Sequence, residues 1–151
     1  MTRGSSIHNE AMVRHLLRAV TSTGARVRVE AYLGPNVGYA DLLAELGSLR
    51  VIVEAERTHR RVLADLRKAR TIGATHLVIA TSTSRVAASV LRRLQDGKKS
   101  PGDPCIVVRP LALAAQALTD LFSRIPGGEC QAEINATNPA PSSGPLERRA
   151  P

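Results

Sequence analysis

The sequence predicts an α/β fold with a mixed central sheet and helices on both faces. Three short strand-like segments follow one another at 26–32, 39–46 and 49–56, and the turns between them are too short for crossover connections. An apolar run without alternation at 75–81 is typical of a strand that is covered on both faces, and a helical pattern precedes it. A meander followed by a strand that is reached through a helix gives a mixed sheet.

The helices are predicted from apolar residues at three- and four-residue spacing. In the first helix, over 7–22, this pattern includes Val13, Leu16 and Val20, and Gly24 ends the helix. Three later helices and a fifth strand complete the order α-β-β-β-α-β-α-β-α. They are a basic helix at 58–72, a helix at 84–94, a strand at 105–108 and an apolar helix at 111–122.

Alternation in the first strand predicts that its side chains divide between two sides. Its apolar residues are expected to point one way and its charged residues the other. The first set is Val27, Val29 and Ala31, and the second set is Arg28 and Glu30.

The chain of 151 residues is long enough for one domain with its own core, which we expect over 5–125. Residues 126–151 are rich in Gly, Pro, Ser and Asn, so we expect a disordered tail there. The net charge of +8 favours a polyanionic partner such as DNA, or reflects solubility alone. Because the sequence has neither a membrane-length apolar run nor a signal-peptide core, we expect a cytoplasmic protein that does not enter the membrane.

Two glutamates, Glu54 and Glu56, share one side of an otherwise apolar strand, since side chains two residues apart point the same way. The hairpin turns near residues 47 and 48, so paired residues have numbers that add up to about 95, and Asp41 falls opposite Glu54. Like charges in that position destabilise a sheet unless a cation lies between them. Mg²⁺ uses such carboxylate ligands. The pattern indicates either a metal site or ordinary carboxylates, with Glu56 favouring the start of the next helix.

A basic stripe follows these glutamates. When residues 57–70 are placed on a helix, five cations fall on one side, opposite Val62, Leu66 and Ala69. A basic stripe beside an acidic cluster suits a phosphate backbone bound over a metal ion, and it equally suits a solvated helix face. The five cations are Arg57, Arg60, Arg61, Arg67 and Lys68.

The order of elements and the spacing of the acids resemble the PD-(D/E)xK restriction-endonuclease-like superfamily over about residues 5–95. The match consists of Asp41, twelve intervening residues and then Glu54-Ala55-Glu56, with Glu10 as the acid of the leading helix. The resemblance implies an αβββαβ core. It also implies a metal-dependent nuclease that hydrolyses phosphodiester bonds, and we expect DNA to be the substrate.

The resemblance assigns a role to each of these residues. Asp41, Glu54 and the Ala55 carbonyl would bind Mg²⁺ or Mn²⁺, which activates water and stabilises the developing charge. Glu10 would orient a second metal ion or a water molecule. Glu56 stands where the family usually has lysine, and it would accept a proton from the attacking water or bind the metal.

Two departures from the family pattern keep alternatives open. Ala40 stands where the motif has proline, and Glu56 stands where it has lysine. The second departure favours a domain of the same fold that has lost catalysis and binds nucleic acid or a protein partner. A third alternative is an α/β ligand-binding or assembly module whose acids pair with the nearby arginines. The apolar helix at 111–122 is a candidate homodimer surface, because cleavage of two DNA strands usually needs two active sites.

Overall fold

The computed structural model describes residues 7–97 and 99–124, and the predicted tail at 126–151 lies outside the described residues. Within the described ranges, four helices and five strands follow one another in the predicted order. The second helix begins at Val62, later than the predicted 58. The elements are α1 (Ile7–Thr21), β1 (Arg26–Tyr32), β2 (Tyr39–Leu46), β3 (Leu49–Glu56), α2 (Val62–Thr71), β4 (His76–Thr81), α3 (Ser84–Gln95), β5 (Cys105–Pro110) and α4 (Leu111–Ser123).

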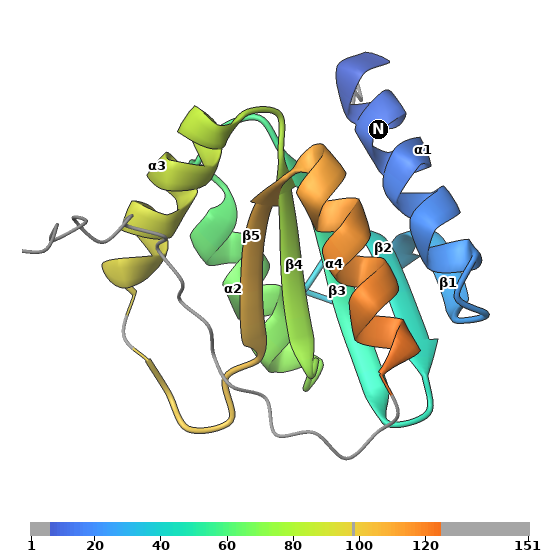
Figure 1. Cartoon of the computed structure of the whole chain (residues 1–151). Coiled ribbons are helices and arrows are strands. Elements are labelled where there is room, and N and C mark those ends of the chain that lie inside the picture. Colours follow the sequence, from blue (N-terminus) through green and yellow to red (C-terminus); the bar gives the residue numbers. More distant parts are fainter. Residues whose placement is uncertain (1–6, 98, 125–151) are drawn as a thin grey trace, which may run out of the picture.

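The five strands form one sheet in the order β1-β2-β3-β4-β5 (Figure 1). Neighbours among β1, β2 and β3 pair antiparallel, whereas neighbours among β3, β4 and β5 pair parallel. The parallel pairs are connected through α2 and α3, which return the chain to the start of the next strand. The predicted mixed sheet is therefore confirmed, and β3 is the strand at which its antiparallel and parallel halves meet.

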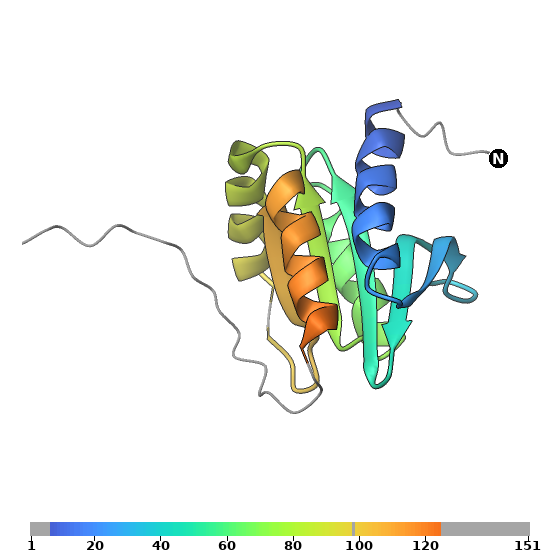
Figure 2. The ribbon, with the colours of Figure 1, turned by 45° about the vertical axis from the view of Figure 1, so that its right-hand side comes forward.

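Helices cover both faces of this sheet, as predicted. Figure 2 shows α1 and α4 on one face and α2 on the other. Val51, Val53 and Ala55 of β3 belong to the apolar core under α1 and α4, whereas Ile52 belongs to the core under α2 and α3. Because β3 is buried on both sides, the two glutamates that share the face of Ile52 lie in the protein interior.

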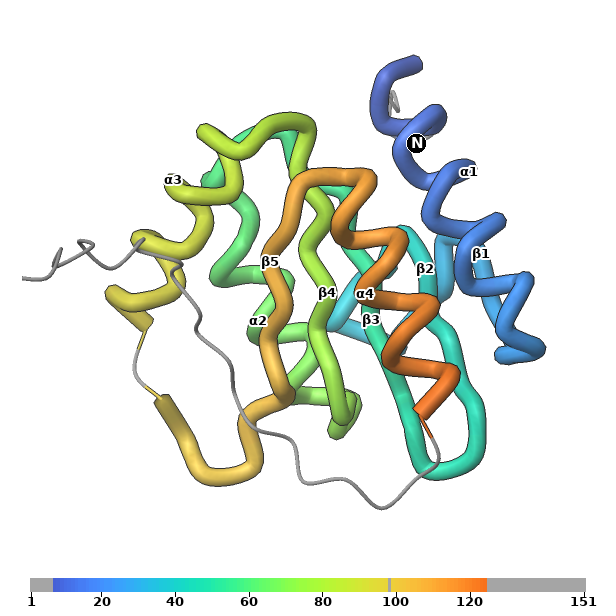
Figure 3. Tube along the Cα trace, in the orientation of Figure 1, coloured from blue at the N-terminus to red at the C-terminus, as the bar shows by residue number. Residues whose placement is uncertain are grey.

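The parallel strands place their carboxyl ends at one edge of the sheet. This edge lies at the top in Figure 3, opposite the hairpin turn at Gly47, and α1 begins beside it. In open α/β sheets, ligands bind outside the carboxyl ends of the strands. This edge is therefore where the fold itself favours a binding site.

The apolar helix α4 covers the sheet. Its residues Ala114, Leu118 and Phe122 are buried in the core that it shares with α1, while Leu113 stays 58% exposed. The use of α4 as a dimer surface stays a prediction. Among the residues described, no helix combines the length and apolarity that crossing a membrane requires.

The alternation predicted for β1 is wrong beyond its middle. Val27 packs against the core under α1 and α4, whereas Ala31 belongs to the core under α2 and α3. Glu30 between them has a φ of 46°, in the left-handed region that residues other than glycine rarely adopt. This backbone conformation reverses the alternation, so Ala31 reaches the opposite face while Val29 is left 49% exposed.

Replacing Glu30 with glycine is expected to raise the free energy of unfolding by about 0.5–1 kcal/mol, because glycine adopts a positive φ without a steric clash. Urea denaturation measures the change. The matched control is Glu45→Gly on β2, outside the left-handed region, which is expected to lower stability by about 1 kcal/mol. Equal losses at both positions would show that the backbone at Glu30 carries no strain.

Candidate functional site

The strands β2 and β3 part at the point where their acids face each other. Their register ends at Leu42↔Val53, which confirms the predicted pairing and puts Asp41 opposite Glu54. Side-chain hydrogen bonds then take over from the backbone ladder. The Asp41 backbone N–H donates to Glu54 Oε2 at 3.2 Å, and the Ala55 N–H donates to Asp41 Oδ2 at 2.8 Å. The two carboxylates are therefore held together by the backbone of each other's strand.

A lysine from α2 completes this arrangement. Lys68 Nζ donates to Glu54 Oε1 at 2.9 Å and to Asp65 Oδ1 at 2.9 Å. All three side chains are buried, so these ion pairs are shielded from solvent. Burial by itself lowers the pKa of Lys68, but the charges of Glu54 and Asp65 outweigh it and raise that pKa above its ordinary value. Lys68 is therefore a fixed positive charge inside the protein.

We use the term carboxylate cluster for Asp41, Glu54, Glu56 and Asp65. Asp65 Oδ2 is buried and accepts no hydrogen bond from the described residues. Asp65 raises the pKa of Glu56, after the effect of burial, and two neighbouring carboxyl groups can share a hydrogen bond when one of them holds a proton. The cluster therefore has more negative groups than Lys68 can balance, and it must take up a proton or a cation.

The pKa values of the two glutamates of β3 are both raised. Burial, followed by the charge of Asp65, raises the pKa of Glu54 to about 8, although Lys68 acts in the opposite direction. Burial and Asp65 also raise the pKa of Glu56 to about 8, against the lowering effect of Arg61. Carboxyl groups perturbed in this way by desolvation and a charged neighbour are typical of functional sites.

The single stripe of five cations predicted for the helix is wrong. Arg57, Arg60 and Arg61 precede α2, where Thr58 Oγ1 accepts the Arg60 N–H in a local bond that competes with helix formation. These three arginines are exposed.

Within α2, the two remaining cations of the predicted stripe separate. Arg67 is exposed, whereas Lys68 points inward to Glu54. Lys68 is therefore a part of the candidate site and not of its surface.

The leading-helix acid is not joined to the cluster. Glu10 is exposed on α1, which packs on the face of the sheet opposite α2. None of the hydrogen bonds among residues 7–97 and 99–124 connects Glu10 with Asp41 or Glu54. Its predicted role in orienting a metal ion or water stays a prediction.

Sequence reasoning missed Asp65 and placed Lys68 on the nucleic-acid-binding surface and not in the cluster, although a signal was present. The two lie three residues apart, so they fall on one side of a helix, and that side also carries Val62 and Ala69. An acid and a base on the buried face of a helix must find charged partners in the sheet beneath. For Lys68, the candidate partners in the neighbouring strand were Glu54 and Glu56, and the structure pairs it with Glu54.

In the part of the chain that the structure describes, no three or more His, Cys, Asp or Glu side chains are arranged as a preformed metal site. The ammonium of Lys68 lies instead between Glu54 and Asp65. What the cluster can do chemically at this point is hold a proton on Glu54 or Glu56 at neutral pH and exchange it.

Stability is expected to fall as the pH rises from about 4.5 to about 8. Over this range the unfolded chain releases the proton of Glu56, whose ordinary pKa is 4.5, while the folded protein with a pKa of about 8 retains it. Each pKa unit of difference corresponds to about 1.4 kcal/mol. In Glu56→Gln the amide can donate to Asp65 without titrating, so urea denaturation should show a smaller loss from pH 5 to pH 9.

The control for this titration is Glu45→Gln, at a half-buried position paired with Arg50 on the sheet surface. It should retain the pH dependence of the wild-type protein. An unchanged profile in Glu56→Gln would show that Glu56 does not carry the bound proton.

Lys68→Met is expected to lower the free energy of unfolding by about 3–5 kcal/mol at pH 9, because it leaves Glu54 and Asp65 buried without a counter-ion. At pH 5 the loss should be smaller, since the carboxylates can then take up protons. Arg67→Met, one residue away and exposed, serves as the control and should change stability by less than about 0.5 kcal/mol. A loss of equal size at both pH values would contradict the ion-pair explanation.

Comparisons of the chain with protein-family models, with curated proteins and with solved structures find no match. The function must therefore be inferred from the residues and the geometry of the site.

Proposed function

We propose that the chain is a metal-dependent nuclease domain with a PD-(D/E)xK restriction-endonuclease-like core, and that it hydrolyses phosphodiester bonds in DNA. Three features of the site support this. The element order includes the αβββαβ series, Asp41 and Glu54 lie opposite each other where β2 and β3 part, and an arginine-rich segment begins directly after β3.

The observation that carries the proposal is the position of Lys68. The family pattern places a lysine two residues after the second acid, and Glu56 stands there in this chain. The ammonium of Lys68, which comes from α2, lies 2.9 Å from Glu54 Oε1. The lysine that the motif has at the position of Glu56 is thus supplied by Lys68 of α2, and the site keeps two acids and a lysine close together. In this role Lys68 is a positioning residue that fixes the carboxylate of Glu54.

A hard divalent cation would take the place of the proton that the carboxylate cluster holds. What supports this is that Asp65 Oδ2 lacks a donor among the described residues, so the cluster has an unused acceptor oxygen. Asp41, Glu54 and the Ala55 carbonyl would hold Mg²⁺ or Mn²⁺. Mg²⁺ commonly uses one or two protein carboxylates together with water and substrate phosphates, so a preformed group of three protein ligands is not required. When bound, the ion supplies Lewis-acid chemistry to the phosphate and to water.

Glu56 is the proposed proton acceptor. In the hydrolysis, a water oxygen bonds to phosphorus, the bond from phosphorus to the leaving oxygen breaks, and the water proton passes to a base. A base works best when its pKa lies near the working pH, and burial raises the pKa of Glu56 to about 8. Glu10 of α1 stays a candidate for orienting a second metal ion or a water molecule.

DNA is the proposed partner because the exposed cations gather beside the cluster. Arg57, Arg60 and Arg61 directly follow Glu56 in the chain, and Arg67 is exposed on α2. Arginines at such positions can bind backbone phosphates without reading the sequence of bases. We also propose that the domain acts in the cytoplasm, and that α4 with its exposed Leu113 provides a dimer surface for cleavage of both strands.

A second candidate function is binding of nucleic acid or a protein partner without catalysis. The observation that favours it is the burial of the acids, since Glu54 is 3% and Glu56 is 7% exposed. In addition, both oxygens of Glu54 already accept hydrogen bonds, from Lys68 and from the Asp41 N–H. In this second function the cluster has a purely structural role, which is to lock α2 onto the sheet.

The nuclease proposal predicts that the purified protein cleaves plasmid or single-stranded DNA with Mg²⁺ or Mn²⁺, and that EDTA abolishes the cleavage. Asp41→Asn and Glu54→Gln should each lower the rate at least about 100-fold, because an amide is a far weaker metal ligand than a carboxylate. Asn at position 41 keeps an oxygen that can accept the Ala55 N–H, whereas Gln at position 54 keeps only one of the two acceptors that Lys68 and the Asp41 N–H use. Circular dichroism must therefore show that each variant is folded before its rate is compared. Gel electrophoresis of the products measures the rate.

The matched control is Glu45→Gln, which should cleave like the wild-type protein. If the wild-type protein leaves both substrates intact with either metal ion, the nuclease proposal is wrong. DNA affinity that weakens with salt would then support the second candidate, and its absence would exclude DNA as the partner.

A further inference from the structure

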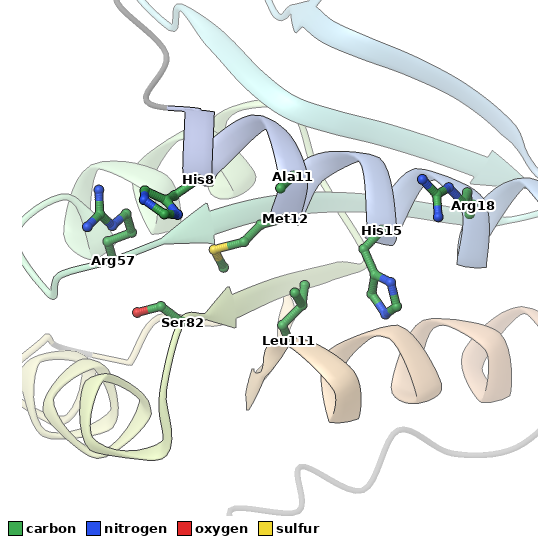
Figure 4. Close-up of a pocket in the computed structure, with 8 residues that line it drawn as sticks. All are labelled: His8, Ala11, Met12, His15, Arg18, Arg57, Ser82 and Leu111. Carbon is green, nitrogen blue, oxygen red and sulfur yellow. The ribbon is translucent and has the colours of Figure 1, made fainter.

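A cavity of about 500 Å³ lies on the face of the sheet opposite the carboxylate cluster (Figure 4). It is bounded by α1 from His8 to Arg18, by the start of α4 and by the residues that follow β3 and β4. It therefore lies at the carboxyl ends of the parallel strands, where open α/β sheets bind ligands. A volume of this size is typical of small-molecule sites.

The chemistry of the lining points to an anion. Arginine and histidine side chains from α1 and from the end of β3 surround the cavity, and a serine hydroxyl follows β4. None of the described residues that line it is acidic. Alanine, methionine and leucine side chains supply an apolar wall. The lining consists of His8, Ala11, Met12, His15, Arg18, Arg57, Ser82 and Leu111.

Polar side chains lie toward both ends of this cavity. In Figure 4, His8, Arg57 and the hydroxyl of Ser82 lie toward one end, while His15 and Arg18 lie toward the other. The first three residues come from α1 and from the positions directly after β3 and β4, and they converge only through the fold. Met12 is buried at the middle of the lining, so an apolar wall lies between the two polar ends.

The end of β3 links this cavity with the carboxylate cluster. Glu56, the last residue of β3, belongs to the buried carboxylate cluster on the side of α2, whereas Arg57, the next residue, lines the cavity beside α1. A strand of nucleic acid that crosses the carboxyl edge of the sheet would therefore meet the cavity directly beside the cluster.

We propose that this cavity binds a phosphate group, with His8, Arg57 and Ser82 as its donors. Guanidinium, imidazole and hydroxyl groups are the usual donors to phosphate oxygens. The apolar wall has room for the sugar or base attached to that phosphate. The proposal deepens the nuclease function and rests on it for the source of the phosphate, which is the backbone or the end of the nucleic-acid strand.

The test measures binding without cleavage. A fluorescein-labelled, 5′-phosphorylated single-stranded oligonucleotide is titrated in EDTA, and fluorescence anisotropy gives its affinity. Arg57→Gln and His8→Gln are each expected to weaken binding about tenfold, as the loss of one phosphate contact does. Arg57→Gln, which removes a positive charge, is also expected to reduce the salt slope by about 0.7. Arg92→Gln on α3, an exposed cation on the other face of the sheet, is the matched control and should bind like the wild-type protein.

Competition distinguishes the sources of the phosphate. Inorganic phosphate and adenosine monophosphate at millimolar concentration displace the oligonucleotide if the cavity takes a free phosphate group. If neither competes but the two variants still lose affinity, the cavity takes phosphate only as part of a strand. Affinities of the two variants equal to that of Arg92→Gln would overturn the proposal.

The outcome for the nuclease function can be distinguished from the outcome for the phosphate cavity. A wild-type protein that cleaves DNA, with cavity variants that bind normally, leaves the nuclease and excludes the phosphate cavity. A wild-type protein that never cleaves DNA, with cavity variants that lose affinity, leaves the cavity and excludes the nuclease.

Discussion

The buried ammonium of Lys68 is the interaction on which the rest of the site depends. It joins α2 to β3 through Glu54 and holds Asp65 in the same contact. Removing these charges from water costs several kcal/mol per ion, and good geometry with further hydrogen bonds must offset that cost. Glu54 meets this condition because it also accepts the Asp41 N–H where β2 and β3 part. One cation thus fixes a helix, two strands and the acids between them.

The excess of carboxyl groups around that cation gives the cluster its chemistry. Asp65 Oδ2 lacks a donor among the described residues, and the pKa of Glu56 rises to about 8 through burial and through Asp65. A natural protein keeps such a cluster as a locked structural contact or as a site that binds a cation or moves a proton. Because β2 and β3 part at these acids, we favour the explanation that the cluster binds a cation or moves a proton.

The carboxyl edge of the parallel strands unites the proposed features. Glu56, the last residue of β3, joins the carboxylate cluster, and Arg57, the next residue, lines the basic cavity. An acidic interior on one side and a basic cavity on the other suit a partner that needs both a cation and a phosphate contact.

The sequence by itself determined the order of the elements, nearly all their bounds and the pairing of Asp41 with Glu54, because short turns and strand periodicity leave few other arrangements. It failed where long-range contacts override local pattern. The reversed alternation at Glu30 depends on a backbone conformation that the pattern of side chains does not encode. The inward position of Lys68 was decided only by the tertiary structure, since an ammonium enters a protein interior when distant carboxylates stabilise it there.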